Sequence, residues 1–275
     1  MPTFHCDVAI AWASFAWISA YLMLKKRHPD LDVKLFDFRE KFTYVPALHE
    51  AIGNTERLKS MQFDLKSVYG EDFVYARVKE IQKQHYLLLE DGSKRHFTYA
   101  VIATGSCVNM YGKKDFEKHA HTVRRAEDIP KLNKALENAE HATVIWWGFT
   151  GVEVASVLAE RRKDIQVRLV HSKEKLFDRF GNSVWELSFS YLKKQWVSII
   201  LNDKVASMTD HSIILKSGKE LPSDVSIIAT WIKINNTAHK ENLTFENDYV
   251  SLESDNIWMC GDVAIHGLYT TAHNA

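Results

Sequence analysis

The chain has 275 residues, 46% of them apolar, and its 35 basic residues balance 35 acidic ones. These values describe a globular protein of one large or two modest domains, with no excess of positive charge that would favour nucleic acid. Its three cysteines are odd in number and far apart, which disfavours a disulfide framework, a CxxC redox pair and a thiolate zinc site.

The first patterned segment, residues 8–24, carries no charge over 17 positions and is followed by three cations at 25–27. One interpretation is a short membrane anchor. The other divides the segment into a buried strand containing Val8 and Ile10 and a helix over 14–26, whose terminal cations suit the negative end of the helix dipole. A strand over 33–37 follows, so the second interpretation predicts a βαβ unit and a parallel sheet.

The remaining elements follow in chain order. A long loop with helical pieces is predicted to about residue 70, then strands near 73–78, 86–89 and 99–102. Beyond these, the pattern predicts a helix near 129–138, strands around Thr143, Val167 and Ser198, a hairpin over 205–221, a strand closing near Ile228 and a last strand at 256–259.

The opening pattern occurs twice. Shifted by 134 residues, it lies on a second βαβ pattern without a gap, pairing Ile10 with Val144, Trp12 with Trp146, Phe15 with Phe149, Asp30 with Asp164, and Val33 and Leu35 with Val167 and Leu169. The strand end 101–105 matches 227–231 at nearly the same offset. We predict an α/β protein with two Rossmann-like dinucleotide-binding domains, the second (113–235) inserted within the first (1–112 and 236–275).

Glycine is scarce, with 11 residues where average usage gives roughly 19, while tryptophan occurs eight times. A dinucleotide fold places G-x-G-x-x-G between its first strand and helix, for a tight turn, close approach of the pyrophosphate and close helix packing. Here those positions are Trp12, Ser14 and Trp17 in the first unit and Trp146, Gly148 and Gly151 in the second. At the later strand ends, Gly105 corresponds to Trp231.

Indole at these positions is expected to penalise positive φ and to obstruct the pyrophosphate. Trp17 is expected to push its helix outward or to rotate away from the strand, since the third glycine exists for close contact. Trp185 and Trp258 are interpreted as ordinary core tryptophans.

The two turns, the strand ends and the segment 260–264 together resemble the flavoproteins with two dinucleotide-binding domains, the pyridine nucleotide-disulfide oxidoreductase superfamily. The segments 39–46, 148–153 and 232–235 are similar in particular to type II NADH:quinone oxidoreductases and apoptosis-inducing-factor-like NAD(P)H oxidoreductases. The resemblance covers the whole chain and adds Trp196, which occupies a usual glycine position between a helix and a strand.

The resemblance implies a cytoplasmic FAD-dependent NAD(P)H oxidoreductase that passes hydride from NAD(P)H to FAD and electrons to a quinone-type acceptor. It also implies peripheral membrane contact through a C-terminal region beyond residue 275. In such a protein Asp37 would receive the adenosine ribose of FAD and Asp262 its ribityl chain. Pro46 and the neighbouring Tyr44 would lie near the isoalloxazine.

In the second unit, the resemblance places Glu153 close to the nicotinamide, as the catalytic candidate. His171 replaces the acid at the strand end, which leaves the choice between NADH and NADPH open. The other cofactor-binding positions that the resemblance gives are Phe15, Ala16, Arg39, Lys41, Val78, Thr104, Phe149, Thr150 and Gly261. A metal site is not expected, because no H-E-x-x-H or related cluster occurs.

Three functional hypotheses stay open. The first is the oxidoreductase, impaired to the extent that tryptophan obstructs its turns. The second is an engineered or decayed scaffold or binding module of the same fold without cofactors, and the third is a membrane-anchored protein using residues 8–24.

Overall fold

The structure, a computed structural model, describes most of the chain, namely residues 4–12, 15–146, 148–177, 181–229, 232–234, 243–246, 249–252 and 256–264. These residues form two compact units. Unit 1 contains the described residues of 1–42, 63–107 and 233–275, and unit 2 contains those of 43–62 and 108–232.

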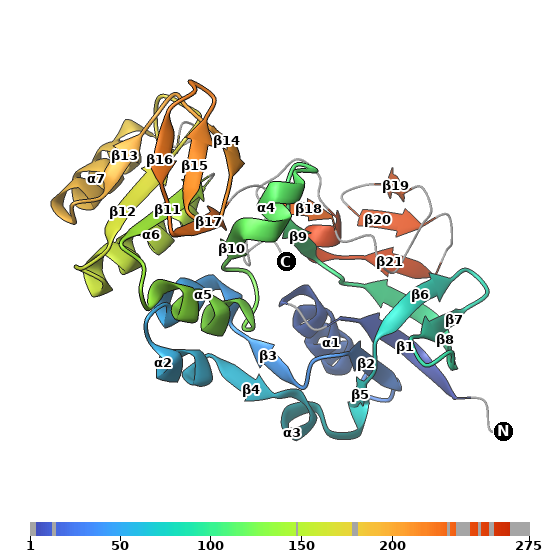
Figure 1. Cartoon of the computed structure of the whole chain (residues 1–275). Helices are drawn as coiled ribbons and strands as arrows, with labels where there is room; N and C mark the ends of the chain where they lie inside the picture. Colours follow the sequence, from blue (N-terminus) through green and yellow to red (C-terminus); the bar gives the residue numbers. More distant parts are fainter. Residues whose placement is uncertain are drawn as a thin grey trace. The chain divides into compact units, whose positions relative to one another are not determined.

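Unit 1 is built on a parallel sheet in the strand order β5-β2-β1-β8-β21 (Figure 1). It opens with β1 (His5–Ala11), α1 (Phe15–Arg27) and β2 (Val33–Asp37). Its other parallel strands are β5 (Phe73–Tyr75), β8 (Lys94–Ile102) and β21 (Ile257–Met259). Antiparallel pairing adds β6 (Val78–Gln82), β7 (Tyr86–Leu89), β19 (Leu243–Glu246) and β20 (Tyr249–Leu252) to the same sheet. The short elements are β3 (Lys41–Thr43) paired with β4 (Gln62–Asp64), α3 (Leu65–Tyr69), η2 (Gly70–Asp72), β9 (Ser106–Val108) paired with β18 (Ile232–Ile234), and η4 (Gly261–Ala264).

Unit 2 has a five-stranded parallel sheet in the order β10-β17-β11-β12-β13 (Figure 1). Its strands are β10 (Ala120–Thr122), β11 (His141–Trp146), β12 (Gln166–Val170), β13 (Ser198–Ile200) and β17 (Val225–Ala229). An antiparallel sheet consists of β14 (Val205–Met208), β15 (Ser212–Leu215) and β16 (Glu220–Pro222). The helices are η1 (Val45–Ala51), α2 (Thr55–Ser60), α4 (Lys114–His119), α5 (Asp128–Leu136), α6 (Phe149–Arg161) and α7 (Asn182–Lys194).

The predicted repeat is confirmed in the backbone. Helices α1 and α6 each have 13 residues and coincide residue for residue under the shift of 134. The pairing register repeats as well, since Val8 lies opposite Val33 in unit 1 and Ala142 lies opposite Val167 in unit 2. The predicted α/β architecture with two doubly wound parallel sheets is therefore observed.

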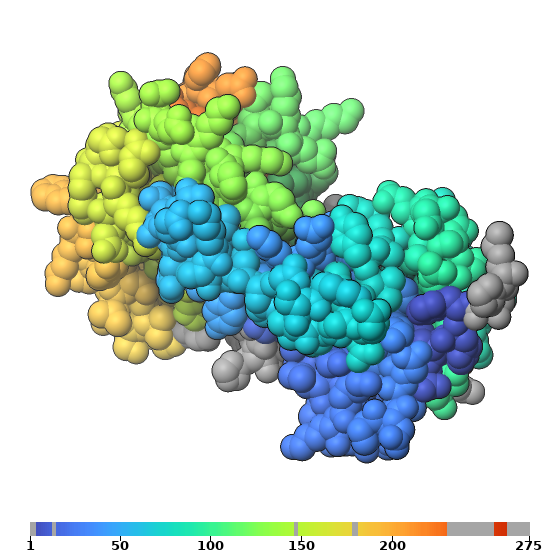
Figure 2. Space-filling view, turned by 90° about the horizontal axis from the view of Figure 1, so that it is seen from below, coloured from blue at the N-terminus to red at the C-terminus, as the bar shows by residue number. Residues whose placement is uncertain are grey.

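Residues 43–62 lie in unit 2, although the predicted division placed them in the first domain. The guanidinium of Arg161 on α6 donates to the carbonyls of Glu50 and Ile52, each at 2.6 Å. The amide of Gly53 donates to the side chain of Asn133 on α5 at 2.8 Å. These bonds, and the burial of Leu48 in the unit 2 core, hold η1 and α2 on that unit. The outer surface of α2 is visible in light blue in Figure 2.

The segment 8–24 forms β1 and most of α1 rather than one long helix. The anchor hypothesis required a single apolar span, and α1 has only 13 residues. Within the described part of the chain, no helix is long and apolar enough to cross a membrane.

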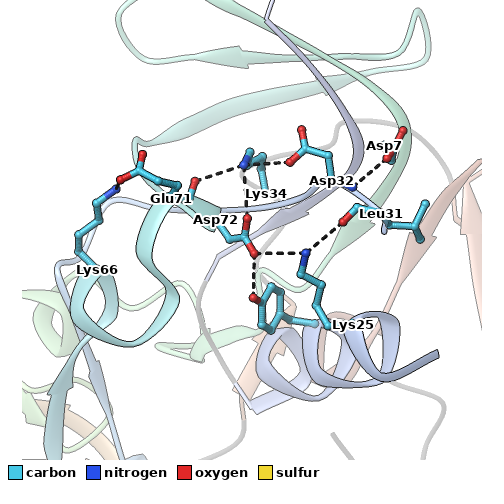
Figure 3. A network of polar contacts seen from close by, with 9 residues as sticks. Asp7, Lys25, Leu31, Asp32, Lys34, Lys66, Glu71 and Asp72 are labelled. Carbon is cyan, nitrogen blue, oxygen red and sulfur yellow. Dashed lines mark hydrogen bonds and ion pairs between the residues drawn. The ribbon is translucent and has the colours of Figure 1, made fainter. Parts of the chain in front are cut away.

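A polar network joins α1, β2 and η2 (Figure 3). Asp72 accepts a hydrogen bond from the Tyr21 hydroxyl at 2.8 Å and lies 3.5 Å from the ammonium of Lys25 and 3.3 Å from that of Lys34. Lys34 also lies 2.9 Å from Asp32. Burial raises the pKa of Asp72, but the Tyr21 hydrogen bond and the two lysines outweigh burial and hold that pKa below its ordinary value.

Trp196 follows α7 in a left-handed conformation, with φ of 64°. Its amide donates to Lys193 and the amide of Val197 donates to Leu192, both at 3.0 Å, which is the Schellman arrangement that ends helices at glycine. The positive φ strains the backbone of any residue that has a Cβ. Because the indole is 88% exposed, its packing offsets little of that strain.

We therefore expect Trp196→Gly to raise the free energy of unfolding by about 1 kcal/mol, because glycine adopts positive φ without strain. Trp196→Ala is the control, since it removes the indole and keeps Cβ. Urea unfolding of both variants checks the prediction, and an equal gain in the two would contradict the backbone explanation.

Asp72→Asn is expected to lower the free energy of unfolding at pH 7 by roughly 1–2 kcal/mol, because it removes a charged acceptor from the network. The folded pKa of Asp72 is depressed, so its contribution is complete above the ordinary aspartate pKa and is lost as pH falls through the folded value. Asp30→Asn, which removes an exposed acid of the same charge, is the control. The free energy of unfolding of both variants, measured as a function of pH, checks the prediction. An equal loss of stability in the two variants would contradict it.

Candidate functional site

Trp12 follows β1 at the first fingerprint position, and its backbone is left-handed with φ of 74°. Its amide donates to the carbonyl of Phe36 at 2.7 Å, which holds the turn against β2. The indole is buried and packs edge-to-face on Phe38 with ring centroids 5.3 Å apart. Its N–H is buried and, within the described residues, has no acceptor. The backbone thus has the glycine conformation, while the side chain fills the space beside it.

Trp17 occupies the third fingerprint position and is fully buried in the core between α1 and the sheet. Of the two expected outcomes, rotation of the ring away from the strand is therefore wrong, and displacement of the helix outward stays a prediction. The ring stacks with Tyr21 at 6.5 Å and meets Tyr69 edge-on at 5.0 Å, so aromatic neighbours accommodate it. Its indole N–H is also buried with no acceptor in the described part of the chain, at a cost of about 1–3 kcal/mol.

Asp37 ends β2 at the position predicted to receive a ribose. Its side chain is fully buried, and the guanidinium of Arg39 holds both carboxylate oxygens, with Nε at 3.0 Å from one and Nη2 at 2.8 Å from the other. The Arg39 amide adds a third hydrogen bond at 2.8 Å. The Phe38 ring between these residues lies 3.7 Å from the guanidinium carbon of Arg77. A ribose would reach this carboxylate only after Arg39 moved.

The ends of β8 and β21 place four further predicted residues. Thr104 is buried, and Gly105 has φ of 66° with open space where a Cβ would lie. Gly261 also has positive φ, and Asp262 accepts a hydrogen bond from Ser106 at 2.7 Å. The structure therefore brings Asp262 beside the strand end that carries Gly105.

The other unit 1 positions contribute packing more than polar groups. Ala16 and Val78 are buried in the core. Phe15 packs edge-on against Phe42 with centroids 5.4 Å apart. Lys41 is exposed on β3.

In unit 2, the turn between β11 and α6 is open at Gly148. This residue caps α6 with φ of 114°, and among the described residues no atom other than those of its chain neighbours lies within 4 Å of the position its Cβ would take. Gly151 is buried inside the first turns of α6, where Trp17 lies in α1. Phe149 is 47% exposed with its ring 4.5 Å from Phe177, and Thr150 is exposed. The N-terminal amides of α6 therefore lie behind a glycine, as an anion site needs.

Glu153, one turn into α6, is paired with a residue that sequence reasoning missed. The carboxylate lies 3.6 Å from Nδ1 of His49 on η1. Burial raises the pKa of Glu153, and His49, when protonated, lowers it, with burial the larger effect. The only sequence signal for His49 is its place three residues after Pro46.

Three further predicted positions are placed mainly by their backbone. His171 is buried at the end of β12, and its amide donates to Ile200 at 2.8 Å. Trp146 pairs through its backbone with Ala229. Pro46 opens η1 and is exposed, next to Tyr44. Ser14 and Trp231 lie outside the described residues.

The cysteines are not poised for thiolate chemistry. Cys6 and Cys260 have pKa values raised to about 12, in both cases chiefly by burial. Neither Cys6 nor Cys260 forms a disulfide within the described residues. Among the described residues, no group of three or more His, Cys, Asp or Glu side chains could hold a metal ion.

A dinucleotide therefore fits the two turns differently. In unit 1, buried indoles at Trp12 and Trp17 and the closed carboxylate of Asp37 do not fit a bound diphosphate and ribose. In unit 2, the open glycine at 148 and the helix end behind it fit a diphosphate.

Known proteins are similar to this chain in sequence and fold. Residues 7–275 match the family model described as pyridine nucleotide-disulphide oxidoreductase. Ferroptosis suppressor protein 1 of Taeniopygia guttata is 24% identical over 84% of this chain and 67% of its own length. Apoptosis-inducing factor homolog A of Dictyostelium discoideum is 27% identical over 90% of this chain and 68% of its own length.

Among solved structures, NDH2 from Plasmodium falciparum in complex with NADH superposes with a TM-score of 0.79 at 17% identity, covering 94% of this chain and 64% of that one. The chain thus spans about two thirds of the length of these relatives. With a family match over nearly all its residues and the fold to go with it, the chain belongs to the pyridine nucleotide-disulphide oxidoreductases, a family of FAD- and NAD(P)H-dependent enzymes.

Proposed function

We propose that this protein carries reducing equivalents from NAD(P)H, through FAD, to a quinone-type acceptor. The observation that carries the proposal is the unit 2 turn, where Gly148 leaves the N-terminus of α6 open and Glu153 follows one turn later. When bound there, NAD(P)H would supply a hydride.

The residues of unit 2 would bind and orient that donor. The α6 amides would hold the diphosphate, because a helix N-terminus favours negative charge. Glu153 would contact the nicotinamide end, and His49 would position the Glu153 carboxylate and set its charge. His171, which follows β12, replaces the acid that would repel the 2′-phosphate of NADPH. We therefore propose both NADH and NADPH as donors.

Two further parts of the proposal concern the acceptor. A quinone is supported by the sulfide:quinone oxidoreductase of Aquifex aeolicus, a solved structure that matches 95% of this chain with a TM-score of 0.76 at 18% identity. Because quinones of membranes are apolar, we also propose a cytoplasmic protein with peripheral membrane contact.

A second candidate function rests on the unit 1 turn. With Trp12 and Trp17 buried and Asp37 held by Arg39, this chain could fold without FAD and act as a scaffold or binding module. This candidate predicts neither nucleotide binding nor oxidation of NAD(P)H.

Titration with NADH and with NADPH separates the two candidates, because it needs no flavin. We expect saturable binding to the purified chain and about tenfold weaker binding to Glu153→Gln, equal to about 1.4 kcal/mol. Glu160→Gln, an exposed acid on the same helix, is the control. Absence of binding by both nucleotides would favour the scaffold. Because the indoles close the unit 1 turn, the acceptor is tested with the Trp12→Gly, Trp17→Gly variant, as oxidation of NAD(P)H by a short-chain quinone with FAD added.

The pH dependence of that binding is expected to contain an acidic limb from Glu153. Its pKa is raised by burial, so the limb lies above the ordinary glutamic acid value of 4.5. His49→Asn removes a positive charge and is expected to move the limb to higher pH, whereas Glu153→Gln removes it. A limb that stays in place in Glu153→Gln would assign it to another group.

A further inference from the structure

Two tryptophans occupy backbone conformations that belong to glycine. Trp12 and Trp196 have φ of 74° and 64°, in a tight strand-to-helix turn and in a Schellman helix end. Both arrangements take glycine because a Cβ is strained there. The Trp12 indole packs on Phe38 but leaves its N–H buried without an acceptor among the described residues, and the Trp196 indole is almost fully exposed. Both tryptophans therefore carry a cost that glycine would avoid.

The repeat supplies an internal comparison. Under the shift of 134 that superposes α1 on α6, Trp17 corresponds to Gly151, and both are buried at the same helical position. At the paired strand ends, Gly105 with its positive φ corresponds in sequence to Trp231. The same helical position thus carries tryptophan at 17 and glycine at 151, and the sequence alone gives the second pair, 231 and 105.

The identity of the replacement is the third observation. Single-base changes of glycine codons lead to alanine, valine, serine, cysteine, arginine and the acidic residues as well as to tryptophan. Decay of a dinucleotide site would produce this mixture, with the small residues tolerated best. Instead, the positions 12, 17, 146, 196 and 231 all carry the largest side chain.

We infer that these five positions are glycine in the protein as its own organism makes it, encoded by UGA codons that the organism reads as glycine. UGA is a stop codon in the standard genetic code, and different lineages have reassigned it to tryptophan or to glycine. The sequence with tryptophan at these positions is then the one that results when UGA is translated as tryptophan. This accounts together for the glycine deficit, the tryptophan surplus and the disagreement between a glycine backbone and indole side chains in the unit 1 turn.

The inference is independent of the proposed function, because it rests on backbone conformation and on the repeat. Restored glycines would give Gly-Ala-Ser-Phe-Ala-Gly at 12–17, which is close to the dinucleotide fingerprint.

The nucleotide sequence of the gene is the first test. We expect UGA at codons 12, 17, 146, 196 and 231, and UGG at codon 185, where the Trp185 ring packs 4.7 Å from that of Phe189. UGG at codons 12, 17 and 196 would overturn the inference.

The second test reads the amino acid itself. Tandem mass spectrometry of the protein isolated from the organism that carries the gene is expected to give the residue mass of glycine at positions 12, 17 and 196. The residue mass of tryptophan at these positions would overturn the inference, even with UGA in the gene. Position 185, expected to give the mass of tryptophan, is the control within the same digest.

Discussion

Both units depend on one backbone constraint, a strand that turns directly into a helix through a residue at positive φ. In unit 1 that residue is Trp12, the first fingerprint position, whose Cβ and indole must be accommodated in the turn. In unit 2 it is Gly148, the second fingerprint position, which caps α6. The parallel register, the helix length and the order of the matching strands are shared. The two units therefore follow one strand-helix plan, and the residue at positive φ differs in its place and in its type.

The repeat and the α/β fold were predictable from sequence, because hydrophobic period, helix length and stop signals recur at a fixed offset. The burial of Trp17 was not predictable, since the room for its ring comes from Tyr21 and from Tyr69 on a distant segment. His49 gave no motif, and its role follows from a contact across a hundred residues with Glu153. The placement of 43–62 in unit 2 depends on hydrogen bonds from Arg161 to backbone carbonyls, which no side-chain pattern encodes.

The electrostatics follow the same division. In unit 1 the charged groups form ion pairs with one another, Asp37 with Arg39 and Asp72 with its two lysines. These pairs therefore contribute to the stability of the fold. In unit 2 burial raises the pKa of Glu153 and His49 opposes this, with burial the larger effect, so the Glu153 carboxylate changes charge nearer to neutral pH than an ordinary one. The group best suited to respond to a ligand thus lies next to the open turn.

The central claim is that the unit 1 backbone is that of a dinucleotide site and that indole side chains close its turn to the diphosphate. The most direct measurement is the visible absorption spectrum of the purified chain and of its Trp12→Gly, Trp17→Gly double variant, each loaded with FAD and freed of unbound flavin. Trp185→Phe serves as a control for the loss of a tryptophan elsewhere. The account predicts a colourless parent chain and control and a yellow double variant with one flavin per chain. Stoichiometric flavin in the parent chain, or a folded double variant that stays colourless, would contradict it.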